Sequence, residues 1–158
     1  MILRVRRLAV ATVWLAVVLA AIPHAAAQSN VVLDEILSED ELSYQSAAYL
    51  VLVSTKRIDE GSSPTEAVRA LAQLRWAVAG REAGDAVSLG EWAHLLMQAF
   101  EFPGGLMYRI VPGPRYAARE LAALGIAEGN AMVNMRLSGE RALRQLGRAL
   151  AWADGERL

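Results

Sequence analysis

The chain repeats part of itself with a period of fifty residues. The stretch SLGEWAHLLMQAF, at residues 88–100, and the stretch SGERALRQLGRAL, at residues 138–150, both begin with serine and continue with helical apolar spacing. EAVRALAQLRW, at residues 66–76, likewise falls on YAARELAALGI, at residues 116–126. Chance similarity between alanine-rich helices is the alternative, but the shared serine and the equal spacing favour a repeat. Two packed helix pairs can bury the apolar stripes that one pair would leave exposed.

Serine residues mark the predicted helix starts. A serine followed three positions later by glutamate forms a capping box, in which the two side chains satisfy backbone amides at the start of a helix. Gly125 suits a left-handed helix end. Capping boxes are predicted at Ser38 with Glu41, Ser63 with Glu66 and Ser88 with Glu91, and Ser138 is predicted to start the last helix. We expect structural roles for Ser63, Ser88, Ser138 and Gly125.

The predicted helices leave little room for strands. The first covers residues 39–58, although the run YLVLV within it also fits a buried strand. The second ends at Gly80, and the third stops at the FPGG stretch. Residues 28–39 form a lead-in, with a short strand or a turn of helix as alternatives, and LMYRIVPGP forms an apolar connector. No segment alternates convincingly, so the predicted fold is all-α, a small helical bundle.

Residues 1–27 have the three parts of a secretory signal peptide. Three arginines form a positive start, an apolar run follows, and three alanines end at Ala27. The apolar run is shorter than the roughly 20 residues that cross a bilayer comfortably, which favours cleavage after Ala27 over a retained membrane anchor. The surrounding residues fit general secretion better than twin-arginine export. We therefore expect an exported protein in the periplasm or at the cell surface, with no stable membrane span after cleavage.

Cleavage would leave a chain with an acidic balance. Removing three arginines from the 16 basic and 17 acidic residues leaves 13 against 17, a net charge of −4. No basic field would then attract phosphates, which argues against a nucleic-acid partner. The absence of cysteine excludes disulfides, cysteine metal sites and a thiol nucleophile.

The predicted organisation is a signal peptide at 1–27, a lead-in and helix at 28–62, and a helical domain at 63–158 with repeats at 64–102 and 113–153.

The second copy of the repeat resembles a surface-layer homology (SLH) module. Such modules have a first helix that ends in an LxxLGIxxG turn, then a loop, then a serine- or threonine-containing element that opens a second amphipathic helix. The matching residues are Leu121, Leu124, Gly125, Ile126 and Gly129 in the turn, Ser138 and Glu140 in the second element, and Trp92 at the aromatic position of the first copy. The resemblance covers residues 64–152 as two degenerate copies.

The resemblance implies a helical fold and an interaction with a cell-wall polymer. The chain departs from the SLH pattern in two features that concern the ligand rather than the fold. The aspartate-rich loop usual in SLH modules is missing from NAMVNMR. Leu89 and Gly139 occupy the place of the polymer-binding arginine. Two copies are also fewer than the three that commonly assemble a binding unit.

No residue pattern predicts a catalytic centre, a metal site or a cofactor. His94, the one histidine after residue 27, has neither a nucleophile nor an orienting acid in its pattern, so we expect a structural histidine. The acidic group matches no calcium loop and is interpreted as a solvated helix start. It comprises Asp34, Glu35, Glu39, Asp40 and Glu41.

Aromatic rings and guanidinium groups gather around the connector between the two repeats. Tyr108, Arg109, Arg115 and Tyr116 lie on both sides of its prolines. Stacking faces and planar donors suit sugar rings and anionic polymer groups, so these four residues are the predicted ligand contacts. In the alternative, the tyrosines pack in the core and the arginines pair with acids.

The sequence thus predicts a non-catalytic exported envelope protein, a binding or scaffolding module of the cell wall or envelope. An alternative is a protein-interaction module, in which the helix at 39–58 docks on another envelope protein or on a second copy. An exposed apolar face on AAYLVLV would favour that alternative. An envelope hydrolase is a distant third possibility, because it needs a pair of facing carboxylates that the pattern does not provide.

Overall fold

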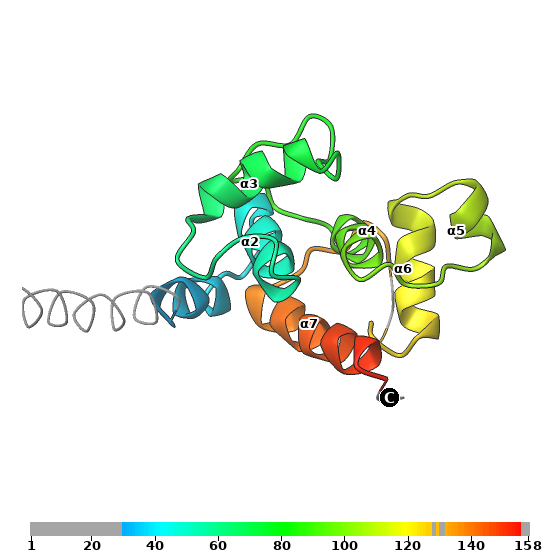
Figure 1. Cartoon of the computed structure of the whole chain (residues 1–158). Helices are drawn as coiled ribbons and strands as arrows, with labels where there is room; N and C mark the ends of the chain where they lie inside the picture. The colour runs from blue at the N-terminus through cyan, green and yellow to red at the C-terminus, as the bar shows by residue number, and fades with distance from the viewer. Residues whose placement is uncertain (1–29, 128, 130–131, 156–158) are drawn as a thin grey trace, which may run out of the picture.

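We describe the fold from a computed structural model of the chain, which places residues 30–127, 129 and 132–155 (Figure 1). These residues form helices, turns and two isolated β-bridges, with no strand among them. The predicted all-α bundle is confirmed for this part of the chain. The predicted signal peptide at 1–27 lies outside it. None of the helices at the described positions combines the length and the apolar character that crossing a bilayer requires.

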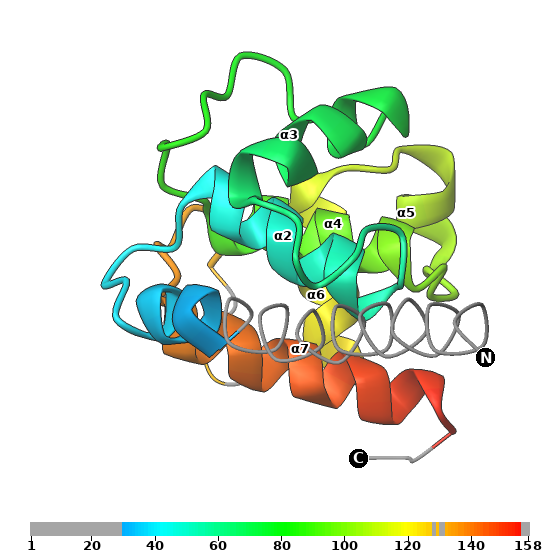
Figure 2. The same ribbon diagram turned by 60° about the vertical axis from the view of Figure 1, so that its left-hand side comes forward.

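Three helices form the centre of the bundle. The lead-in is helical at residues 30–37. The helices that follow are α2 (Tyr44–Ser54), α3 (Pro64–Gln73), α4 (Leu89–Ala99), α5 (Leu106–Ile110), α6 (Pro114–Ala123) and α7 (Gly139–Ala153). The central helices α2, α4 and α7 contact one another, α3 packs on α2, and α6 packs on α4 (Figures 1 and 2). The short helix α5 contacts α6 and comes from the segment predicted to be an apolar connector.

The helices pair differently from the sequence repeat. The repeat makes α3 and α4 one pair and α6 and α7 another. Among the described residues, each outer helix instead covers the central helix that precedes it, α3 on α2 and α6 on α4. The helix α2 therefore belongs to the centre of the bundle. Its residues 47–52 are all buried and Val53 is half-buried, so the AAYLVLV run lacks an exposed apolar face of the kind that docking on a partner would use.

Three of the predicted serine caps are confirmed. Ser63 and Ser88 form complete capping boxes at the starts of α3 and α4, with Glu66 and Glu91 as the partners. The Ser138 hydroxyl accepts a hydrogen bond from the Arg141 amide at the start of α7. These interactions are local in sequence, which is why the residue spacing alone identifies them.

The predicted cap at Ser38 is wrong, and the first long helix is shorter than expected. Ser43 is the N-cap of α2, and its side chain accepts from the Ser46 amide. Glu39 then takes the place of the capping-box acid, because its carboxylate accepts the Ser43 amide hydrogen at 2.7 Å. The helix ends at Ser54, before Lys56, whose φ is 56°. The YLVLV run is helical.

The fifty-residue spacing recurs in the backbone. The helices α3 and α6 begin at Pro64 and Pro114 and have equal lengths. Each is followed by a residue in the left-handed conformation, Arg75 with φ 60° and Gly125 with φ 73°. The predicted role of Gly125 is confirmed, whereas the end predicted at Gly80 for the second helix is wrong. In the first repeat, Arg75 thus adopts the left-handed conformation that ordinarily favours glycine, at the position where the second repeat has Gly125.

The starts of the three central helices are joined in a closed cycle of backbone hydrogen bonds. The first amides of a helix have no acceptor within that helix. Here, a carbonyl in the segment before each central helix accepts a hydrogen bond from the first amide of another central helix. The bonds are Tyr44 N to Asp85 O at 2.8 Å, Leu89 N to Met135 O at 2.8 Å and Gly139 N to Glu39 O at 2.9 Å. We call residues 39–45, 83–90 and 133–139 the helix-start ring.

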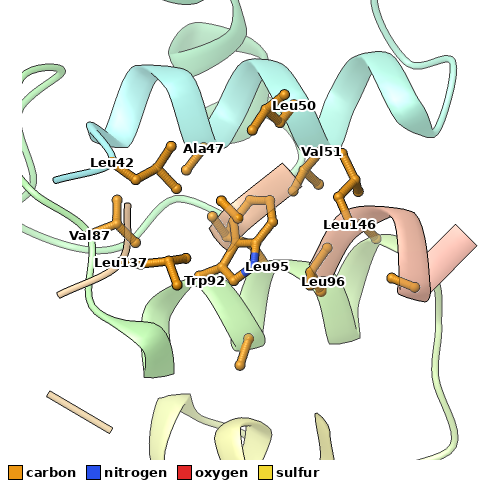
Figure 3. Packing of buried hydrophobic residues seen from close by; sticks show 14 of the residues in the cluster. Leu42, Ala47, Leu50, Val51, Val87, Trp92, Leu95, Leu96, Leu137 and Leu146 are labelled. Atoms are coloured by element: carbon orange, nitrogen blue, oxygen red, sulfur yellow. The ribbon is translucent and has the colours of Figure 1, made fainter. Parts of the chain in front are cut away.

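Apolar side chains fill the inside of the helix-start ring. The residue before each serine cap is Leu42, Val87 or Leu137, and all three are buried. The Leu42 amide donates to Leu137 O at 2.6 Å, and the Val87 amide donates to Leu42 O at 2.8 Å. Trp92 of α4 is 0% exposed and lies among these residues, pointing toward α2 (Figure 3). Backbone pairing and apolar burial therefore coincide at one place.

Gly139 should be required for closure of the helix-start ring. A Cβ atom at this position would overlap the backbone carbonyl of Ile36, which cannot move aside as a flexible side chain can. We expect Gly139→Ala to lower the free energy of unfolding by about 2 kcal/mol or more, as overpacking does. Urea unfolding measures this change.

Gly147 provides the matched control on the same helix. An added Cβ there meets nothing within 4 Å, and the position is exposed. Gly147→Ala should raise the free energy of unfolding by about 0.5–1 kcal/mol through helix propensity. Equal effects of the two substitutions would contradict the close approach at Gly139.

Candidate functional site

Two solvent-open clefts of similar size are candidate sites on the described surface. The connector cleft has a volume of about 370 Å³ and contains part of the predicted ligand contacts. The α4 groove has a volume of about 360 Å³ and lies at the start of α4. They differ in chemistry, because the first is lined mainly by apolar and aromatic groups and the second by charged and polar groups.

The structure brings together only two of the four predicted ligand contacts. Tyr108 and Arg109 line the connector cleft beside Phe102. Arg115 and Tyr116 lie in the first turn of α6 and are not part of this lining. Arg115 is exposed and Tyr116 is half-buried. The four residues therefore do not form one contiguous site.

Tyr108 is held by a contact with His94. The Tyr108 hydroxyl lies 3.1 Å from His94 Nδ1, and the two rings meet edge to face with centroids 5.9 Å apart. Burial lowers the pKa of His94 below its ordinary value of 6.5, and burial raises the pKa of Tyr108. His94 thus stays neutral near pH 7 and ties α5 to α4. This contact uses the Tyr108 hydroxyl to fix the position of the connector.

The α4 groove is built by three segments that are distant in sequence. Arg81 comes from the loop after α3, Pro114 from the start of α6, and Arg136 from the loop before α7. The full lining comprises Arg81, Ser88, Glu91, Pro114, Val133, Asn134 and Arg136. An antiparallel bridge between Ser88 and Arg136 holds two of its walls together. The groove is therefore an outer face of the helix-start ring.

Glu91 is the one carboxylate in the described lining of the α4 groove. Its Oε2 atom accepts from the Ser88 amide and hydroxyl, at 2.8 and 2.7 Å. Its Oε1 atom accepts from Arg81 Nε and Nη2, at 2.8 and 2.6 Å. Burial acts to raise the pKa of Glu91, but the bonds from Ser88 and Arg81 outweigh it, so the pKa is lowered. The carboxylate is ionised and neutralised by Arg81.

Arg136 adds a second guanidinium group to the groove. Its Nη1 atom donates to the Ala86 carbonyl at 2.6 Å, and the residue is exposed. A guanidinium group has five N–H donors, so this bond and the two that Arg81 makes to Glu91 leave donors on both groups for oxygen atoms of a ligand. With two arginines and one carboxylate, the groove has a net positive charge although the whole chain is slightly acidic.

Neither Arg81 nor Arg136 was predicted from the sequence as a site residue. Both lie in loops, where helical periodicity carries no information. The one available signal is that Arg136 falls fifty residues after Ala86, so the Arg136–Ala86 contact joins equivalent positions of the two repeats. A repeat alignment alone does not show that equivalent positions touch each other.

The predicted acidic helix start contains one structural carboxylate. Besides the Ser43 amide, Glu39 accepts from the Ser46 hydroxyl at 2.7 Å.

Within the described ranges, no group of three or more histidine, aspartate or glutamate side chains is arranged to hold a metal ion.

Comparison of the chain with models of protein families, with characterised proteins and with solved structures gives no match. The resemblance to SLH modules therefore stays a prediction from the residues.

Glu91 should contribute more to stability than the equivalent glutamate of the exposed capping box. Glu91→Gln removes the charge that Ser88 and Arg81 bind, and we expect a loss of about 1–3 kcal/mol in the free energy of unfolding at pH 7. Because the folded-state pKa is lowered, this contribution is present above about pH 4.5 and is lost as the pH falls through the folded-state pKa. The difference between the variant and the wild type should therefore shrink in acid. Glu66→Gln at the exposed box of α3 is the control, and a loss there as large as for Glu91→Gln would contradict the role of burial.

His94 should make stability depend on pH in a separate window. Because burial lowers its folded-state pKa, the unfolded chain binds a proton first, and stability should fall as the pH drops below about 6.5. The free energy of unfolding of the wild type and of His94→Gln, measured between about pH 7.5 and 5.5, should show a weaker slope for the variant. Parallel curves would show that His94 does not titrate differently on folding.

Proposed function

We propose that the protein is a non-catalytic envelope protein that binds an anionic, hydroxyl-rich polymer of the cell wall through the α4 groove. The observation that carries this proposal is the convergence of Arg81 and Arg136 on one open groove. The signal-peptide pattern supports an exported location. The resemblance to SLH modules supports the class of ligand.

The chemistry of the groove suits a polymer of sugars with acidic groups. Guanidinium groups form strong, directional hydrogen bonds to carboxylate and phosphate oxygens. The Asn134 amide provides both a donor and an acceptor for hydroxyl groups. An open groove accepts an internal segment of a chain, whereas an enclosed cavity would admit only a chain end or a small molecule.

The walls of the groove are fixed before any ligand arrives. Arg81 is held by Glu91, and Arg136 is held by a carbonyl of the helix-start ring. Side chains that are already ordered lose less conformational entropy on binding. A preformed groove therefore favours recognition by several modest contacts, as repeated units of a polymer provide.

Binding agrees better with the groove than hydrolysis does. Glycoside hydrolysis ordinarily uses two carboxyl groups, one of which must be protonated to act as an acid. The described lining has the single carboxylate of Glu91, whose pKa is lowered and which is paired with Arg81. A carboxylate in that state is a poor general acid near neutral pH.

Arg136→Gln provides the direct test of the α4 groove. The purified protein should sediment with cell-wall sacculi that carry their anionic polymers and stay in the supernatant when those polymers are removed. Loss of one charge-assisted contact should weaken sedimentation by about tenfold. Added salt should also weaken it, because it screens the charges.

Two further variants separate the α4 groove from other surfaces. Arg144→Gln on α7 is the charge-matched control, because Arg144 is exposed and paired with Glu140 four residues earlier. It should sediment like the wild type. The pair Arg109→Gln and Arg115→Gln tests the predicted contacts at the connector. If the pair lost binding while Arg136→Gln bound normally, the polymer site would lie at the connector instead. If no variant sedimented in a polymer-dependent way, the proposed function would be rejected.

A further inference from the structure

The described residues include one concentrated group of exposed large apolar side chains. Leu106, Met107, Ile110 and Val111 are 69%, 56%, 64% and 58% exposed. These four lie within six consecutive residues, and we call them the α5 tip. Scattered exposed apolar residues are common, but a contiguous group indicates a surface that is covered in use.

The α5 tip is held rigidly at the periphery of the molecule. The helix α5 lies outside α6, at the edge of the bundle in both views (Figures 1 and 2). The Tyr108 ring lies so close to Gly104 that a Cβ atom there would overlap it. The Tyr108 hydroxyl is bound to His94, as described above. One side of the short helix is thereby anchored, and the four apolar residues remain exposed.

The one charged residue within α5 is cationic. Arg109 lies within α5 and is exposed, and Arg115 and Arg119 are exposed on α6, the helix that α5 contacts. Two acids flank this segment: Glu101 is exposed before it, and the Glu120 carboxylate lies beside Gly105 at the base of α5. The α5 helix itself thus carries apolar side chains and one positive charge, on a chain whose net charge is −1.

We propose that the α5 tip inserts into the surface of a lipid bilayer that carries anionic headgroups. Apolar side chains on a projecting element enter the boundary between headgroups and acyl chains, and nearby arginines bind the anionic lipids. A second copy of the chain is a poorer occupant, because it would bring two cationic tips together. The insertion is shallow and reversible, since only four large apolar side chains take part.

This site is independent of the α4 groove. The tip and the groove share no lining residue, so a polymer and a bilayer would contact different elements of the same molecule. The protein would then connect the cell-wall polymer to the membrane surface. Failure of either proposal leaves the other open to its own test.

A site-specific label tests the insertion on the full chain. Because the sequence has no cysteine, Met107→Cys can carry a single fluorophore whose emission shifts to shorter wavelength in an apolar environment. Vesicles of one part phosphatidylglycerol to three parts phosphatidylcholine should shift the emission, and vesicles of phosphatidylcholine alone should shift it much less. The same fluorophore at Gly147→Cys on α7 is the control and should not respond. Attachment through residues 1–27 alone would shift neither label.

Substitutions in the labelled protein measure the two contributions. Ile110→Ser should weaken vesicle binding by about tenfold, because it removes a large apolar side chain. Arg109→Gln should weaken it by about fivefold, as expected for one arginine near an anionic surface. Arg136→Gln in the α4 groove should leave it unchanged. Ile110 is exposed, so circular dichroism and the melting temperature should confirm that Ile110→Ser folds normally.

Three results would overturn the proposal. The first is a Met107 label that does not respond to the anionic vesicles. The second is an equal response of the Gly147 label, which would indicate unspecific adsorption or unfolding. The third is a concentration-dependent shift of the Met107 label without lipid, which would show that a second copy covers the tip.

Discussion

The hydrogen bonds that link the starts of α2, α4 and α7 are the constraint on which the rest of this structure depends. Every helix begins with amide hydrogens that it cannot satisfy itself, and leaving them buried and unpaired is costly. Here the segment before each central helix accepts them from another helix in a closed cycle. The buried Leu42, Val87 and Leu137 then fill the inside of the cycle. No central helix can move away without breaking polar and apolar contacts together.

The same ring produces different surfaces at equivalent positions. At the start of α4, the loop before α7 and the start of α6 leave an open groove with two arginines. At the start of α7, the Ile36 carbonyl packs directly against Gly139, so the lead-in covers that position. At the start of α2, Glu39 turns back to bind the Ser43 amide. Repetition in sequence therefore gives similar helices, and the segments between them decide which helix start is open to a ligand.

The two proposed binding surfaces use opposite physical properties. The α4 groove offers fixed guanidinium groups, whose directional bonds suit charged and hydroxylated polymers. The α5 tip offers apolar side chains with arginines nearby, which suit the boundary of an anionic bilayer. His94 and Tyr108 hold the tip to the bundle through α4, the helix that also begins at the groove. One central helix thus supports both surfaces.

The amino-acid sequence by itself determined the all-helical fold, the caps at Ser63, Ser88 and Ser138 and the left-handed end at Gly125. Each of these follows from interactions between residues a few positions apart, and such interactions leave a readable spacing. The sequence did not reveal that Ser43 replaces Ser38 as the cap of α2, that α2 lies at the centre, or that Arg81 and Arg136 share a groove. Those features depend on contacts between segments up to about a hundred residues apart, such as Gly139 with Glu39. Only the tertiary structure decided them, because the energy of a long-range contact depends on how the whole chain packs and not on local spacing.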